Sequence, residues 1–309
     1  MKSITVEALM TKFSLEVLTG QDQLHRIILK SETRRPGLEF IDDFAFIGME
    51  HIQILGKNEI NYLHTLSDEE CKMRIGNIVK YNPPCIIITW QQEEPVGLLQ
   101  YCAEEGIPVL RTREATSIFN PKLDAYLVKT LAAEIAIHGV CVNVAGIGIL
   151  LRGKSGVGKS ETAHTLIGKG HRLVADDIVV LKKISPQVLL GTHDGKNREF
   201  LALRSVGLLN VVRLYGRTAF QDETRIVLDI ELTKWQENAL NNELELEEKF
   251  VEYMGVKVPH IQIQLQPGRD VAGLIEAAAN NWYLKQEGYS ATEEFMQRIE
   301  AEIADASSE

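Results

Sequence analysis

No part of this sequence constrains the fold more than one glycine-rich segment, Gly153-Lys154-Ser155-Gly156-Val157-Gly158-Lys159-Ser160. It matches the full pattern G-x-x-x-x-G-K-[ST], which joins a β-strand to the start of a helix and binds phosphate. The residues before it, GIGILLRG, are typical of a strand, and helically spaced Ala163, Leu166 and Ile167 follow it. The segment therefore predicts an α/β core with a phosphate-binding loop. A glycine-rich structural turn is the alternative.

The residue types of this loop fit the binding of a nucleoside triphosphate. Glycines at 153, 156 and 158 let backbone N–H groups converge on phosphate oxygens without Cβ clashes, and the helix N-terminus adds partial positive charge. Lys159 is expected to reach the β and γ phosphates, and Ser160 to ligate Mg²⁺. The loop thus predicts ATP and Mg²⁺ as cofactors.

Two adjacent acids form the second signal. The apolar run 173–175 ends on Asp176 and Asp177, and ligands of open α/β sheets sit beyond the carboxyl ends of strands. One carboxylate could hold Mg²⁺, and the other could accept a proton from an attacking hydroxyl. A solvated turn is the alternative for the two acids.

His138 is a third candidate, expected where a helix (LAAEIAIH) meets a strand. A histidine whose ring is hydrogen-bonded at the end of a helix is its plainer interpretation.

Composition excludes several classes of protein. With 309 residues, of which 45% are apolar, the chain is long enough for two domains with ordinary cores. A formal charge of -10 disfavours a nucleic-acid partner. The longest apolar stretch, 139–151, is shorter than the roughly 20 residues of a membrane span, and the start has no secretory signal, so a cytoplasmic location is expected. Buried, reduced thiols are expected at Cys71, Cys85, Cys102 and Cys141.

The organisation along the chain predicts an N-terminal α/β domain over residues 1–128 and a second domain over 129–309. In the first, HIQILG, CIIITW and IPVLRT are typical of strands separated by helices, which is a parallel pattern. The sequence Phe119-Asn120-Pro121 indicates a turn, with a helix from Pro121 to His138. In the second domain RLVADDIVVL reads as one strand and GTHDGKNREF as irregular, with helices from about Val271 onward.

These motifs together resemble the HPr kinase/phosphorylase family of Gram-positive bacteria. The resemblance runs almost from end to end, and its order and spacing make it specific. The matching segments are RRPGLE (34–39), IQILG (52–56), HGV (138–140), GKSGVGKSE (153–161), GHRLVADD (170–177), LRSVGLLNV (203–211), QPGR (266–269) and AAANNWYLKQEGYSATEEF near the end.

The resemblance implies an activity and an assembly. Enzymes of this family phosphorylate a serine of the phosphocarrier protein HPr with ATP or pyrophosphate, and remove that phosphate by phosphorolysis to give pyrophosphate. In this way they control carbon catabolite repression. They form homohexamers, and their N-terminal domain resembles the uridine-binding domains of cell-wall ligases. Their C-terminal domain is a P-loop kinase domain resembling phosphoenolpyruvate carboxykinase-type cores.

The resemblance also assigns roles to residues. It implies that the loop 153–160 holds the nucleotide, with Lys159 in the catalytic set and Ser160 on the metal. Asp177 matches the general base of the forward reaction, which becomes the proton donor in reverse, Asp176 matches a metal-helping neighbour, and His138 matches a further active-site position. The segment tied to phosphorolysis corresponds to Gln264, Leu265, Gln266, Pro267, Gly268 and Arg269.

Three positions depart from the family pattern. A glutamate that serves as second Mg²⁺ ligand is replaced by Ala202, and Glu199 is three residues too early to substitute for it. Glu243 stands where the family has a catalytic arginine, and a carboxylate there would repel a transferring phosphoryl group. In the phosphorolysis segment one arginine is replaced by Gln266, while Arg269 is kept. The acidic run that begins at Glu243 also fits a solvated helix face.

Three functions follow from these observations. The first is the bifunctional protein-serine kinase and phosphorylase, which retention of Asp176, Asp177 and His138 favours. The second is an ATP-binding regulatory homologue of weakened activity, possible in a divergent second copy of the enzyme, which Ala202 and Glu243 favour. The third is a P-loop kinase for a small molecule, since such a loop reports phosphate binding and not the acceptor.

Overall fold

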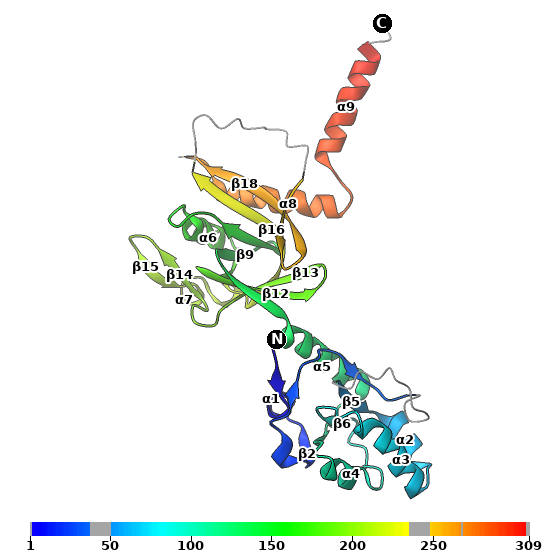
Figure 1. Ribbon diagram of the computed structural model, residues 1–309. Coiled ribbons are helices and arrows are strands. Elements are labelled where there is room, and N and C mark those ends of the chain that lie inside the picture. Colours follow the sequence, from blue (N-terminus) through cyan, green and yellow to red (C-terminus); the bar gives the residue numbers. More distant parts are fainter. Residues whose placement is uncertain (1, 38–50, 235–247, 267, 307–309) are drawn as a thin grey trace. The chain divides into compact units, whose positions relative to one another are not determined.

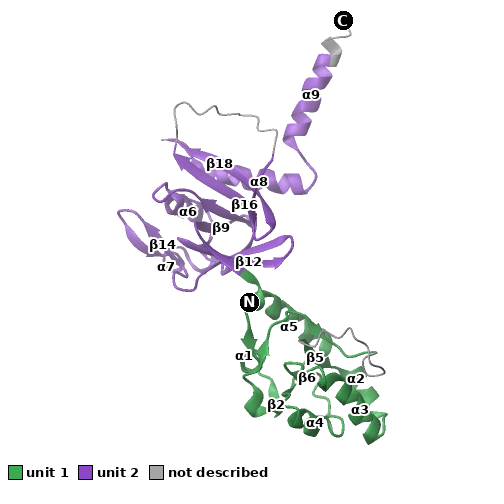
Figure 2. Ribbon diagram, viewed as in Figure 1, with its two compact units in different colours: residues 1–133 green, residues 134–309 purple. Residues whose placement is uncertain are grey.

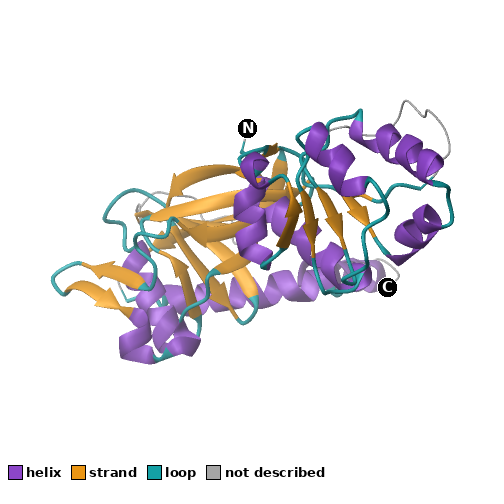
Figure 3. Cartoon of the chain, turned by 90° about the horizontal axis from the view of Figure 1, so that it is seen from below, coloured by secondary structure: helices purple, strands orange, loops and turns teal. Residues whose placement is uncertain are grey.

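Two compact units, residues 1–133 and 134–309, make up the chain (Figures 1 and 2). The computed structural model describes residues 2–37, 51–234, 248–266 and 268–306. Each unit combines a β-sheet with packed helices (Figure 3), which confirms the predicted α/β class. In the described part of the chain, no helix is long and apolar enough to cross a membrane.

Unit 1 is built on a sheet in the order β2-β7-β6-β5-β4. Strands β4 to β7 run parallel, as the sequence predicts, and β2 joins the edge antiparallel to β7. The elements in chain order are β1 (Ile4–Thr5), α1 (Val6–Phe13), β2 (Glu16–Thr19), η1 (Gln21–Gln23), β3 (Ile27–Ile28), β4 (Thr33–Arg34), β5 (Ile52–Leu55), α2 (Lys57–His64), α3 (Asp68–Val79), β6 (Ile86–Ile88), α4 (Leu98–Glu104), β7 (Val109–Arg111) and α5 (Thr116–Leu131).

Strand β6 explains why apolar and polar residues do not alternate in the sequence CIIITW. Ile86 and Ile88 pack with α2, α3 and α4, whereas Ile87 packs on the opposite face with α1 and α5. All three side chains are fully buried because helices cover both faces of the parallel sheet.

The turn predicted at Phe119-Asn120-Pro121 is wrong, because Pro121 lies inside α5. Phe119, Leu123 and Leu127 lie on the buried face of this helix and are at most 1% exposed, so packing outweighs the cost of the proline. The helix predicted to reach His138 is also wrong beyond Leu131. Residues 133–138 form a strand instead, whose buried fraction alternates with a period of two.

Unit 2 contains a larger mixed sheet in the order β11-β9-β10-β16-β13-β12-β8, and β18 pairs with both β16 and β17. Its elements are β8 (Ala133–His138), β9 (Val140–Val144), β10 (Ile147–Arg152), α6 (Lys159–Gly168), β11 (Arg172–Ala175), β12 (Ile178–Ser185), β13 (Val188–His193), β14 (Phe200–Leu203), β15 (Gly207–Asn210), α7 (Val211–Tyr215), η3 (Arg217–Ala219), β16 (Glu223–Lys234), β17 (Lys249–Tyr253), β18 (Val256–Leu265), α8 (Val271–Gln286) and α9 (Ala291–Ala306).

Three neighbouring strands, β10, β16 and β18, run parallel, so their carboxyl ends meet at one edge of the sheet. Alternate residues of β10 pack on opposite faces. Ile149 and Leu151 join a core with α6 and α8, and Leu150 joins a core with β12, β13 and β17. The glycine-rich loop begins where β10 ends, and the sheet therefore fixes its position.

Two further expectations for unit 2 are corrected. RLVADDIVVL forms two strands, because Asp177 adopts a φ of 69° and turns the chain between β11 and β12. The first residues of GTHDGKNREF are not irregular but end β13. The helices expected from about Val271 are confirmed as α8 and α9, and all four cysteines are buried free thiols, as predicted.

Close packing at Gly148 in β10 gives a stability test. A Cβ atom there would lie 2.0 Å from the carbonyl oxygen of Arg225, so Gly148→Ala is expected to destabilise unit 2 by about 1–3 kcal/mol. Gly168 has no atom within 4 Å of the corresponding position. Gly168→Ala should leave stability unchanged or raise it by up to about 1 kcal/mol. Urea denaturation followed by circular dichroism measures both, and equal midpoints would contradict the packing argument.

Candidate active site

The glycine-rich loop connects β10 to α6, in the strand–loop–helix order that the sequence predicts. Gly153, Gly156 and Gly158 have φ values of 141°, 73° and 110°, in the region that favours glycine. At two of these glycines, neighbouring atoms also leave no space for a side chain. A Cβ at Gly153 would lie 2.3 Å from the carbonyl oxygen of Leu232, and one at Gly156 would lie 2.5 Å from the guanidinium of Arg204. The loop therefore requires glycine for conformation and for space.

Lys159, the first residue of α6, folds back over the loop. Its Nζ donates hydrogen bonds to the carbonyl oxygens of Gly153, at 3.0 Å, and of Lys154, at 3.3 Å. An ammonium group held across a loop with a helix N-terminus at its end creates a positive site suited to phosphate.

Asp176 is a buried carboxylate, 5% exposed, at the end of β11. Its Oδ1 accepts a hydrogen bond of 2.9 Å from Ser160 Oγ, and its Oδ2 accepts one of 2.9 Å from the backbone N–H of Ala202. Burial raises the pKa of Asp176, and these two hydrogen bonds oppose the rise. One side chain thus ties the start of α6 to β11 and β14.

Asp177, the next residue, is exposed, with a side chain that is 68% accessible to solvent. His138 Nδ1 lies 3.5 Å from its Oδ1, and the backbone N–H of Gly139 donates to its carbonyl oxygen at 3.1 Å. His138 was expected at a helix–strand junction, but it ends strand β8. The tight turn at Asp177, in which the N–H of Ile178 donates to the carbonyl oxygen of Asp176 at 2.9 Å, therefore brings the histidine and an exposed carboxylate together.

A cavity of about 290 Å³ lies beside these groups. Ser155, Gly156 and Gly158 of the loop, together with Lys159, Ser160 and both aspartates, line it. Among the described residues, His138 and the segment 264–269 are not part of its lining. The sequence did not predict four further lining residues, which the β14–β15 hairpin and the segment before it provide: Asn197, Phe200, Arg204 and Leu208. The contact between Arg204 and Gly156 could be found only from the structure, because these residues are far apart in the chain.

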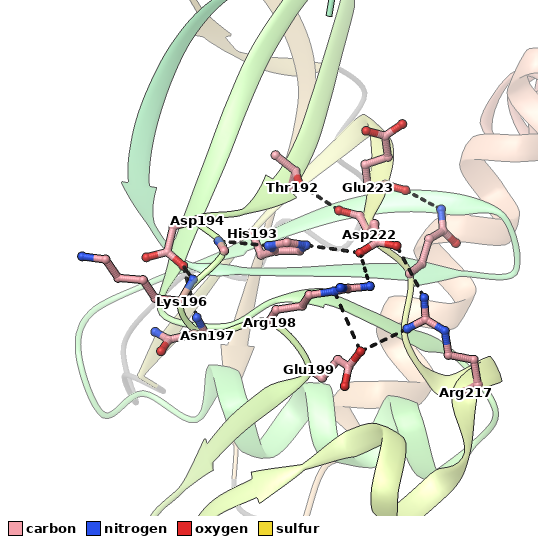
Figure 4. A network of polar contacts seen from close by, with 12 residues as sticks. Thr192, His193, Asp194, Lys196, Asn197, Arg198, Glu199, Arg217, Asp222 and Glu223 are labelled. Carbon is pink, nitrogen blue, oxygen red and sulfur yellow. Dashed lines mark hydrogen bonds and ion pairs between the residues drawn. The ribbon is translucent and has the colours of Figure 1, made fainter. Parts of the chain in front are cut away.

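Ala202 lines this cavity, and its methyl group offers no ligand atom. Figure 4 shows that Glu199 is engaged elsewhere. Its carboxylate lies 3.2 Å from Arg217 and 3.8 Å from Arg198, and both arginines also pair with Asp222. Glu199 is not among the residues that line the cavity. Glu199 therefore does not take the place of a metal-binding glutamate at position 202.

The segment 264–269, for which the resemblance implies a part in phosphorolysis, begins at the end of β18, where Gln264 and Leu265 complete the strand. The side chain of Leu265 packs against Gly158 of the loop, 3.7 Å from where a Cβ would lie. The chain then turns, with Arg269 N–H donating to the Gln266 carbonyl oxygen at 3.1 Å, and Gly268 lies within this turn. Pro267 and Glu243 lie outside the described residues.

The donor set beside the loop fits Mg²⁺. Within the described ranges, no three His, Cys, Asp or Glu side chains are grouped so as to form a metal cage. The Ser160 hydroxyl and the Asp176 carboxylate offer two oxygen atoms, and Mg²⁺ in nucleotide sites takes few protein ligands and completes its shell with phosphate oxygens and water.

A glycine-rich loop between a strand and a helix, its lysine, a serine–aspartate pair and a second exposed carboxylate define a P-loop phosphotransferase. The comparisons give the particular family. Residues 4–127 match the family model described as HPr Serine kinase N terminus, and residues 129–299 match that described as HPr Serine kinase C-terminal domain. The chain belongs to the HPr kinase/phosphorylase family.

Two relatives compared by sequence, from Oceanobacillus iheyensis and from a Geobacillus species, agree with this assignment. A protein of Oceanobacillus iheyensis, provisionally named HPr kinase/phosphorylase 2, is 65% identical over 305 residues, covering 99% of this chain and 100% of the relative. The HPr kinase/phosphorylase of a Geobacillus species is 38% identical over 305 residues, or 99% and 98% of the two chains. The solved Hpr(Ser) kinase/phosphatase of Coxiella burnetii aligns at 29% identity and a TM-score of 0.47, over 52% of this chain and 98% of that one.

Asp176→Asn should separate stability from activity. Because burial raises the pKa of Asp176, its ionised form costs stability in the fold. Below the pKa of unfolded aspartate, about 3.9, variant and wild type should be equally stable. As pH rises through that value the wild type should lose stability relative to the variant, and the deficit should be complete above the folded-state pKa.

Thermal melts from pH 3 to 8, without metal or nucleotide, measure this difference. Asparagine keeps an acceptor for Ala202 N–H and a donor toward Ser160, so the contacts survive while the charge is lost. Phosphoryl transfer should fall by at least about 10²-fold if this carboxylate is a ligand of Mg²⁺, because the substitution removes the ligand's charge. A variant less stable than wild type at pH 7 would show that the ionised carboxylate stabilises the fold.

Proposed function

We propose that this protein transfers the γ-phosphoryl group of ATP, or a phosphoryl group of pyrophosphate, to the regulatory serine of HPr, and reverses the reaction by phosphorolysis to release pyrophosphate. The observation that carries the proposal is the pairing of buried Asp176 with Ser160 of the loop, next to exposed Asp177, in one cavity. Family membership supports HPr as the acceptor.

The residues of the loop have complementary roles in this proposal. Backbone N–H groups of 153–160 bind the phosphates, and Lys159 exchanges its loop carbonyls for the β and γ phosphate oxygens. Ser160 and Asp176 would hold Mg²⁺, which supplies charge neutralisation when bound. The hydrogen bond between these two side chains keeps both oxygens oriented toward the cavity.

Asp177 is the general base for the serine hydroxyl, and it returns the proton in the phosphorolysis direction. Its exposure supports this role, because the hydroxyl of a folded protein has to reach it. His138, at 3.5 Å, orients the carboxylate and adds positive charge when protonated. The small-molecule kinase is disfavoured, since family membership favours a protein acceptor.

We also infer the setting of this reaction. Residues 1–128 are taken as the N-terminal domain, similar to uridine-binding domains of cell-wall ligases, and 129–309 as the kinase domain, similar to phosphoenolpyruvate carboxykinase-type cores. The protein is proposed to work as a homohexamer in the cytoplasm, controlling carbon catabolite repression, without a nucleic-acid or membrane partner. The formal charge of -10 disfavours a nucleic-acid partner, and the other parts of this setting rest on the resemblance to the family.

The test is an assay in both directions. Purified protein is incubated with HPr and labelled ATP, and separately with serine-phosphorylated HPr and inorganic phosphate. Label on an HPr serine and release of pyrophosphate are expected, and both should disappear in Asp177→Asn. Transfer to a small molecule without transfer to HPr would overturn the proposal.

A weakened ATP-binding regulator is the second candidate, and Ala202 favours it. This residue stands at the cavity wall where the family pattern has a metal-binding glutamate, and Glu199 is held by Arg217. Glu243 and Gln266 lower the positive charge expected around the phosphates. Under this candidate, nucleotide binding persists while transfer to HPr is slow in both directions.

Ala202→Glu distinguishes the two candidates. The side chain of residue 202 is exposed at the cavity, and its backbone N–H, which holds Asp176, is unchanged by the substitution. If catalysis is limited by a missing metal ligand, the turnover number should rise about 10-fold or more at low Mg²⁺ concentration. Ala202→Gln, which adds similar volume without the charge, is the control. Equal rates in wild type and both variants would exclude the missing ligand as the limiting feature.

A further inference from the structure

Asp229 of β16 is a fully buried carboxylate outside the cavity, and it binds side chains from three other strands. Arg152 of β10 contacts it through two hydrogen bonds, of 2.6 Å from Nε and 2.7 Å from Nη2. Tyr253 Oη of β17 donates at 2.7 Å, and His260 Nδ1 of β18 lies 2.7 Å from Oδ1. One carboxylate thus links β10, β16, β17 and β18.

The charges in this cluster depend on one another. The hydrogen bonds from Arg152 to Asp229 raise the pKa of the guanidinium further above its usual range, so Arg152 stays charged. Burial raises the pKa of Tyr253, so its hydroxyl stays a neutral donor. A buried carboxylate without its cation is strongly unfavourable, so the geometry of Arg152 relative to Asp229 is tightly constrained.

The cluster lies directly behind the loop. Arg152 is the residue before Gly153, so its side chain fixes the point at which the loop leaves β10. Strand β16 runs on from Asp229 to Leu232, whose carbonyl oxygen packs against Gly153, and β18 runs on from His260 to Leu265, which packs against Gly158. Both walls of the loop therefore belong to strands that Asp229 joins.

We propose that Asp229 is a positioning residue for nucleotide binding, holding β10, β16 and β18 in the register that places the loop 153–160 against Leu232 and Leu265. The proposal rests on the phosphate-binding role of this loop in the proposed function. It assigns Asp229 no contact with the nucleotide. The same carboxylate, through His260, also fixes the strand that leads into the segment 264–269.

The test compares two carboxylate-to-amide substitutions in unit 2. Asp229→Asn removes the charge that holds Arg152 while keeping the shape of the side chain. Glu276→Gln is the matched control, because Glu276 also pairs with a cation and a histidine, Lys169 at 2.7 Å and His171 at 2.8 Å, but at the far end of α6. The full chain is titrated with Mg²⁺-ATP by calorimetry, below the melting temperature of each variant.

Asp229→Asn should raise the dissociation constant for Mg²⁺-ATP by about 10- to 100-fold, the penalty expected for a displaced binding group, and raise KM for ATP more than KM for HPr. Glu276→Gln should stay within about twofold of wild type, since it does not contact the loop. If Asp229→Asn does not fold, Arg152→Lys takes its place with the same expectation, because lysine keeps the charge and loses the two-point contact.

Wild-type affinity in the folded Asp229→Asn or Arg152→Lys variant would overturn the proposal, as would an equal loss in Glu276→Gln. Binding is measured without turnover. The comparison of dissociation constants therefore still tests the role of Asp229 if the protein does not transfer phosphate to HPr. Absence of Mg²⁺-ATP binding in the wild type would overturn both.

Discussion

The arrangement of the site depends on the burial of one carboxylate, Asp176. Its two oxygen atoms accept hydrogen bonds from a hydroxyl at the start of α6 and from a backbone N–H of β14, so α6, β11 and β14 are held together around the cavity. Burial disfavours the ionised form, and a ligand that needs this charge offsets the cost. A carboxylate whose charge is disfavoured by burial, as in Asp176, fits a site where a cation and phosphates bind beside it.

The contact with β14 explains how residue 202 can change without loss of the fold. Asp176 is held by the backbone N–H of residue 202, which any residue other than proline supplies, whereas a metal ligand at that position requires a particular side chain. An alanine therefore preserves the architecture of the nucleotide site and removes one oxygen donor. A change at residue 202 can therefore affect phosphoryl transfer without affecting nucleotide binding. For this reason the active enzyme and the weakened ATP-binding regulator are both compatible with membership of the family.

The sequence was most informative where local chemistry is decisive. The loop had to contain glycine because of its dihedral angles, and the apolar run at β6 had to be a strand covered on both faces. It failed where tertiary packing outweighs local preference. Pro121 is tolerated within α5 because Phe119 and Leu123 are buried, and AEIAIH, rich in helix formers, is a strand beside β12. Arg204 was missed because only the hairpin β14–β15 brings it to Gly156.

The central claim is that this chain binds a nucleotide through the loop 153–160, with the serine–aspartate pair at the cation. Calorimetric titration of ATP into wild type and Lys159→Ala, each with Mg²⁺ and with a chelator, tests it most directly. The account predicts tighter binding by wild type with Mg²⁺ than without it, and a loss of at least about 10-fold in Lys159→Ala, since a charge-assisted contact is removed. Equal affinity in wild type and Lys159→Ala, with no effect of Mg²⁺, would contradict it.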